Sequence, residues 1–186
     1  MDIVSRAKNI LLTPQTEWPV IETERTDPAS LYVGYICILA AIPAIAIFLG
    51  LLILGVGFGF AIESAIIRYV AALLTPFIAG FVAAKLAPSF GGQDDVNQGL
   101  KLCAYATTPS WIAGIILLLP RLSWIVLIAS FYGIYLFYLG VPVLMKTPAD
   151  KTIIYMIVIF LVNIVISIVI AAILGAVLLG GGFAMM

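Results

Sequence analysis

Long runs of apolar residues, separated by short polar stretches, dominate the chain after Asp27. A bilayer crossing needs about 20 consecutive apolar residues in a helix, and five runs meet this length. The pattern therefore predicts an all-α membrane protein with five transmembrane helices. The predicted spans cover approximately residues 29–54, 64–87, 96–119, 122–145 and 152–179.

Prolines and capping side chains mark the starts and bends of these spans. Asp27-Pro28 and residues 147–150 (TPAD) each place a capping residue before a first-turn proline. Asp94-Asp95 follows a glycine-rich break and is interpreted as the cap of the third span, with cation binding by this pair as the alternative. Pro43 and Pro109 predict bends within the first and third spans.

Residues 1–27 form a separate segment ahead of the transmembrane domain, which covers residues 28–186. Residues 1–12 have apolar side chains at helical spacing but are too short to span. They predict an amphipathic helix at the membrane interface, with Arg6 and Lys8 toward lipid headgroups. Trp18 is also expected at the interface, where an amphipathic ring is favoured; the alternative is a solvated linker.

The distribution of basic residues predicts the orientation. Five spans put the termini on opposite sides of the membrane. With the N-terminus inside, seven basic residues fall on the cytoplasmic side and two, Arg68 and Arg121, fall outside, which accounts for all 9. The positive-inside rule thus predicts a cytoplasmic N-terminus and an outside C-terminus. The seven inside residues are Arg6, Lys8, Arg25, Lys85, Lys101, Lys146 and Lys151.

Composition excludes several classes of function. The chain is 64% hydrophobic and 10% charged, with mean hydropathy +1.23, which suits lipid rather than water as the solvent. Its net charge of zero predicts no nucleic-acid partner. There is no histidine, and no phosphate loop, nucleophile elbow or HExxH motif is present. We therefore expect no enzymatic activity, no cofactor and no metal site; Cys37 and Cys103 are interpreted as small hydrophobic residues.

A few polar residues lie within the predicted spans. Arg68, near the start of the second span, is either an interface anchor that snorkels outward or a cation facing a cavity. Three tyrosines follow one stripe of the fourth span, and two polar residues lie one turn apart in the fifth. Their side chains are expected to hydrogen-bond between helices, with a substrate path as the alternative. These residues are Tyr132, Tyr135, Tyr138, Asn163 and Ser167.

Three segments resemble the Yip (Ypt-interacting protein) family in its short bacterial form. They are RAKNILLTPQTEWPVI (6–21), FGGQDDVNQGLKLCAYATTPSW (90–111) and YGIYLFYLGVPVLMKTPADKTIIY (132–155). The resemblance implies a five-span fold with a polar cytoplasmic N-terminus, in a bacterial inner membrane. Eukaryotic members of the family bind Rab-type GTPases in vesicle trafficking and carry a longer N-terminal domain than the 27 residues of this chain.

The distribution of basic residues and the resemblance to the Yip family together predict a non-enzymatic scaffold that organises the membrane or binds a protein on its cytoplasmic side. The expected partners are the lipid bilayer, a protein and a second copy of the chain. The alternative hypothesis is a small transporter or channel, oligomeric or not, lined by the tyrosine stripe, Asn163 and Ser167. The residues expected on the cytoplasmic interaction face are Arg6, Lys8, Trp18, Asp94, Asp95, Lys101, Lys146, Asp150 and Lys151.

Overall fold

The computed structural model describes the backbone of residues 2–183 and the side chains of residues 2–119 and 121–169. Within this part the chain is helical and contains no strand. Five helical segments are long and apolar enough to cross a membrane, which confirms the predicted number of spans. The α-helices are α1 (Ile3–Leu12), α2 (Pro14–Thr23), α3 (Pro28–Leu31), α4 (Cys37–Ile53), α5 (Phe58–Leu86), α6 (Val96–Ala106), α7 (Thr108–Ala113), α8 (Trp124–Leu144) and α9 (Ala149–Phe183).

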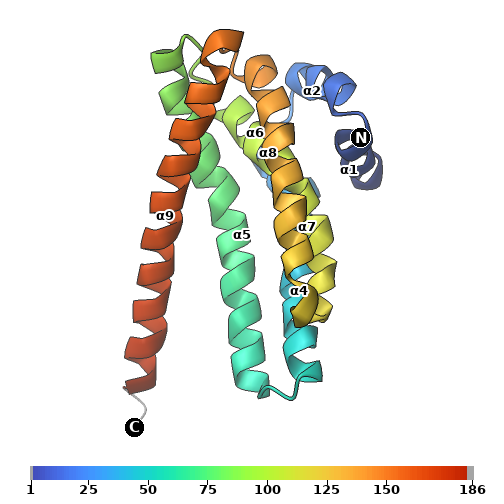
Figure 1. Cartoon of the computed structure of the whole chain (residues 1–186), viewed down its shortest axis with the longest axis vertical. Coiled ribbons are helices and arrows are strands. Elements are labelled where there is room, and N and C mark those ends of the chain that lie inside the picture. The colour runs from blue at the N-terminus through green and yellow to red at the C-terminus, as the bar shows by residue number, and fades with distance from the viewer. Residues whose placement is uncertain (1, 184–186) are drawn as a thin grey trace.

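The helices run along one axis and are connected alternately at the two ends of the bundle (Figure 1). One end, which we call the loop end, carries residues 91–95 and 145–148 together with α1 and α2. The opposite, far end carries the turns at residues 54–57 and 119–123. The predicted gathering of the N-terminal segment with two polar loops is thus present. Which side of the membrane the loop end occupies stays a prediction.

Local sequence signals account for most helix starts. Asp27 accepts a hydrogen bond from the Ser30 backbone N–H, and this bonding to Ser30 lowers the pKa of the Asp27 carboxyl. Asp95 accepts from the Gln98 N–H in the same way, so it is the predicted cap of α6. Asp94 instead forms an ion pair with Lys85, at 2.7 Å between Nζ and Oδ2.

The second and third spans differ in detail from the prediction. Helix α5 begins at Phe58 rather than near Ser64, because the turn from α4 needs only residues 54–57, with Gly55 at φ 77°. The third span breaks at Thr107 into α6 and α7, with Pro109 in the first turn of α7, as the predicted bend required. It then continues as a 3₁₀ helix, Gly114–Leu118.

The centre of the bundle is a close crossing of α5 and α6 at two glycines. A Cβ built on Gly99 would lie 2.3 Å from the Gly80 carbonyl oxygen, and one built on Gly80 would lie 2.7 Å from Leu100 Cα. Glycines at such positions let membrane helices approach until their backbones touch. Helix α6 is thereby the central element of the bundle, with residues 99–106 all buried.

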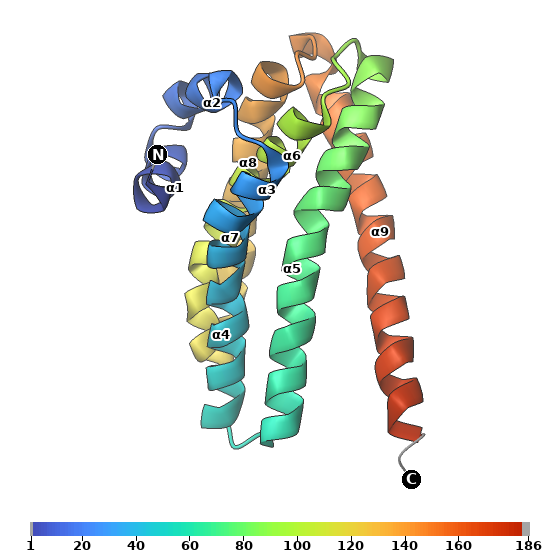
Figure 2. The same cartoon turned by 180° about the vertical axis from the view of Figure 1, so that it is seen from behind.

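Helix α9 lies at one side of the bundle in both views (Figures 1 and 2). Near the loop end it is joined to α5 by Tyr155, which is buried and donates to the Ala83 carbonyl at 2.5 Å. It is joined to α8 by the packing of Phe160 on Phe137, with ring centroids 5.5 Å apart. These contacts fix the loop-end half of α9.

Candidate functional site

The N-terminal segment is held against the bundle by a buried charge cluster. Arg6 on α1 is 3% exposed and forms ion pairs with Glu17 on α2 and with Glu24 just beyond it. Its guanidinium also lies 5.6 Å from the centre of the Tyr105 ring, on α6. A buried arginine requires such partners, because an unpaired charge is very costly away from water. The prediction that Arg6 points toward lipid headgroups is therefore wrong.

The start of α6 binds the chain that connects α2 to α3. The side chains of Asn97, Gln98 and Lys101 donate to backbone carbonyls of residues 21–26, with nitrogen–oxygen distances of 2.5 to 3.0 Å. Lys101 is 2% exposed, so its ammonium group belongs to the interior and not to the predicted interaction face. These hydrogen bonds satisfy carbonyls of the last turn of α2 and of the residues that follow it.

Trp18 packs deep beneath α2 and not at a lipid interface. Its side chain is fully buried and lies so close to Gly140 on α8 that a Cβ there would be 2.8 Å from the indole ring. Ile10 and Ile21 are fully buried in the same cluster. The apolar faces of α1 and α2 thus face the bundle, and the expectation that Trp18 lies at the membrane interface is wrong.

The two polar loops and α2 contact one another. The Gln93 N–H donates to the Met145 carbonyl at 2.8 Å, and Lys146 pairs with Glu22 of α2 at 3.0 Å. A Cβ on Gly92 would meet the Met145 carbonyl at 2.5 Å, which shows how closely the loops approach. The loop end is therefore one continuous surface built from three separate parts of the sequence.

Six of the nine residues predicted for the interaction face are exposed on this surface. Three others, Arg6, Trp18 and Lys101, are buried and instead hold the surface together. A depression of about 440 Å³ lies among residues 22–28, Asn97, Gln98 and Lys101. The exposed predicted residues are Lys8, Asp94, Asp95, Lys146, Asp150 and Lys151.

The tyrosine stripe of α8 lies beside the N-terminal segment. The Tyr132 hydroxyl donates to the Leu11 carbonyl at 2.7 Å. Its partner therefore lies on α1, which is not one of the five membrane-capable segments. Tyr135 lines a groove of about 380 Å³ with residues 12–16, and Tyr138 is exposed. The neighbouring stripe of α8, which includes Ser130 and Phe137, faces a different cavity.

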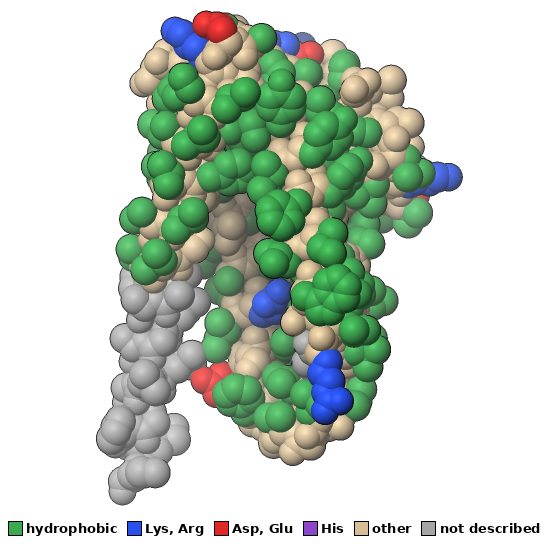
Figure 3. Space-filling view, viewed as in Figure 1, with side chains coloured by type: hydrophobic (Ala, Val, Ile, Leu, Met, Phe, Trp, Pro, Cys, Tyr) green, Lys and Arg blue, Asp and Glu red, His purple; other side chains and the backbone are tan. Residues whose placement is uncertain are grey.

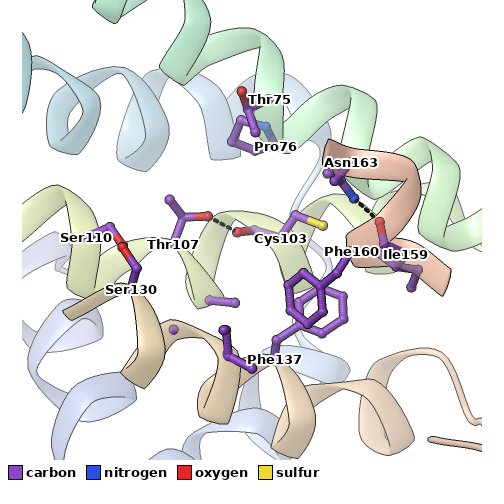
Figure 4. Close-up of a pocket in the computed structure, with 14 residues that line it drawn as sticks. Thr75, Pro76, Cys103, Thr107, Ser110, Ser130, Phe137, Ile159, Phe160 and Asn163 are labelled. Atoms are coloured by element: carbon purple, nitrogen blue, oxygen red, sulfur yellow. Dashed lines mark hydrogen bonds between the residues drawn. The ribbon is translucent and has the colours of Figure 1, made fainter. Parts of the chain in front are cut away.

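The cavity that Ser130 and Phe137 face has a volume of about 210 Å³. It lies between α5, α6, α7, α8 and α9, and Asn163 is among its lining residues (Figure 4). Asn163 donates to the Ile159 carbonyl of its own helix at 2.9 Å, not to a neighbouring helix as expected. Ser167 and Arg68 are exposed, and neither lines this cavity. The tyrosines and Asn163 therefore do not share one path.

The sequence matches the Yip1 domain over residues 8–171, which is most of the chain. The chain belongs to the Yip1 domain family. Among curated relatives, it is 27% identical to the inner membrane protein YohC of Escherichia coli K12 over 143 residues. That match covers 69% of this chain and 73% of YohC, and YohC of E. coli O6:H1 matches equally. No solved structure matches this Yip1 domain.

Membership of the Yip1 domain family and the five membrane-capable helices confirm the resemblance to the Yip family that was seen in the sequence. This Yip1 domain is a multi-pass protein of the bacterial inner membrane. Sequence reasoning missed the buried pairing of Arg6 with Glu17, for which the spacing of eleven residues gives no signal. It also missed Asn97 and Gln98, and it expected Lys101 on the exposed face, although the spacing of the three places them on neighbouring faces at the start of α6.

Proposed function

We propose that this Yip1 domain is a non-enzymatic scaffold that recruits a protein partner to the cytoplasmic side of the membrane. The observation that carries the proposal is the fastening of α1 and α2 to α6 through Arg6, Glu17 and Lys101. A surface that is already ordered loses little conformational entropy on binding. Three separate polar segments are thus presented together as one face.

The exposed charges of this face suit recognition of a protein. Lys8, Asp150 and Lys151 are exposed, and the structure gives none of them an ion pair among the described residues. Charged groups left free in this way set the specificity and the rate of association. The excess of basic residues at the loop end supports its cytoplasmic location by the positive-inside rule.

A transporter remains the second candidate, and the 210 Å³ cavity with Asn163 is what favours it. Transporters place binding groups near the middle of the membrane. The tyrosines of the predicted pathway lie elsewhere, however, and Tyr155 packs between α9 and α5 toward the loop end. These features favour the scaffold over a path for a solute.

Site-specific photo-cross-linking in intact cells tests the scaffold. A photoreactive residue at Gln93, exposed in the loop, is expected to capture a discrete protein adduct. The same residue at Ile153, an exposed apolar position on α9, serves as the matched control and should capture none. Charge reversal by Lys8→Glu with Lys151→Glu should reduce the Gln93 adduct several-fold, because these charges are free for a partner.

Two outcomes would contradict the scaffold. One is the same set of adducts from Gln93 and Ile153, and the other is an adduct at Gln93 that the double charge reversal leaves unchanged. Expression and thermal unfolding of the variant, compared with the unmodified chain, exclude misfolding as the cause of a loss.

A further inference from the structure

The 210 Å³ cavity within the transmembrane bundle has a mostly apolar lining with a few polar side chains among it. Thr75 of α5, Thr107 at the break between α6 and α7, Ser110 of α7, Ser130 of α8 and Asn163 of α9 all line it (Figure 4). Polar side chains are costly within the hydrocarbon of a bilayer unless they have partners. The four hydroxyl residues have partners within the bundle, so Asn163 is the residue with groups left for a ligand.

The internal hydrogen bonds of these residues leave capacity for that ligand. Ser110 and Ser130 bond to each other at 3.1 Å, and Thr107 donates to its own helix at 2.7 Å. Asn163 uses one N–H, to Ile159, while among the described residues its second N–H and its Oδ1 make no hydrogen bond. A carboxamide has two donors and one acceptor oxygen, so Asn163 can donate to an oxygen placed in the cavity.

A cationic side chain lies on the same face of α5 as the cavity. Arg68 precedes Thr75 by seven residues and Ala79 by eleven, both of which line the cavity, so all three share one helical stripe. Seven residues correspond to about 10 Å along the axis toward the far end. Arg68 is exposed, and among the described residues it forms no ion pair.

The cavity opens at the side of the bundle (Figure 3). The molecular surface is hollowed between α8 and α9 (Figure 3). Ile134 of α8 lines the cavity and is an exposed apolar side chain of the kind that contacts acyl chains. A ligand that enters here must come from the bilayer itself.

We propose that the 210 Å³ cavity, which we call the lateral groove, binds one phospholipid molecule. Arg68 holds the phosphate, Asn163 donates to an oxygen of the glycerol ester region, and the acyl chains leave through the mouth between α8 and α9. Arginine suits this position because its planar guanidinium binds phosphate oxygens in pairs. The groove shares no lining residue with the predicted loop-end face, so the proposal holds whether or not that face recruits a protein.

Native mass spectrometry of the detergent-solubilised chain, titrated with phosphatidylglycerol, tests the site. The unmodified chain should retain one lipid at saturation. Arg68→Gln should weaken binding about tenfold or more, since a charge-assisted contact is lost, and Arg68→Lys should restore part of it. Asn163→Leu should weaken it several-fold. Arg121→Gln, which removes an exposed arginine at the far end, is the matched control and should bind as the unmodified chain does.

Several results would overturn the proposal. Equal weakening of binding by Arg68→Gln and Arg121→Gln would mean general attraction of charge rather than a site. Full displacement of the lipid by millimolar glycerol phosphate would mean an anion site without a place for acyl chains. A dimer that forms only when lipid is absent would mean that a second copy covers the mouth. Unchanged thermal unfolding of the variants excludes misfolding as the cause.

Discussion

Replacing Arg6 by methionine is expected to detach the N-terminal segment from the bundle. The change leaves the Glu17 carboxylate, 5% exposed, without its cation. Breaking one side of a buried ion pair typically costs about 3–5 kcal/mol. Hydrogen–deuterium exchange should therefore accelerate by about a hundredfold or more in the backbone amides of α2, while amides of α6 keep their protection.

Two further variants separate the ion pair from other effects at Arg6. Lys8→Met removes an exposed cation from the same helix and should leave exchange in α2 unchanged. Arg6→Met combined with Glu17→Met should recover part of the protection, since no lone buried charge remains. If Arg6→Met alone left α2 protected, the charge cluster would not be what fastens the segment.

Substituting Gly99 by alanine is expected to destabilise the whole bundle. The added methyl group would lie 2.3 Å from the Gly80 carbonyl oxygen, so α5 and α6 would have to move apart. Overpacking of this kind costs about 1–3 kcal/mol or more, against a gain of about 1 kcal/mol from the higher helix propensity of alanine. Because the obstacle is backbone and cannot rotate away, we expect a net loss of about 2 kcal/mol, measured by reversible unfolding in mixed micelles.

Gly59→Ala provides the matched control on α5. A Cβ at Gly59 has no atom of another described element within 4 Å, so only the propensity gain applies and stability should stay equal or rise slightly. A Gly99→Ala variant as stable as the Gly59→Ala variant would show that the two helices do not cross at their backbones.

The helices could be predicted from the sequence because their signals are local. Apolar run length gave the number of spans, and Asp27 and Asp95 stood where capping side chains are needed. The gathering of basic residues at one end followed from counting charges between spans. The start of α5 was missed because Glu63 was treated as a boundary, although an acidic residue can lie within a helix.

The loop-end face and the lateral groove could not be predicted, because both depend on contacts between distant residues. Arg6 was predicted to contact lipid headgroups. The helical spacing of residues 1–12 is the same whether Arg6 is exposed or is buried in an ion pair with Glu17, so the sequence could not distinguish the two. Asn163 was predicted to form a hydrogen bond to a neighbouring helix, but it lines a cavity whose other walls come from four separate helices. Nothing in the spacing of Gly80 and Gly99 indicated that they meet.

Cysteine labelling tests whether the structured loop end faces the cytoplasm. Single cysteines at Lys151, in the loop end, and at Gly57, in the far-end turn, are placed in a chain whose Cys37 and Cys103 are replaced by alanine. A membrane-impermeant maleimide is added to spheroplasts. We expect labelling at position 57 in unbroken spheroplasts and at position 151 only after their membrane is permeabilised. Labelling at position 151 in unbroken spheroplasts, with protection at position 57, would invert the topology and contradict the proposed cytoplasmic scaffold.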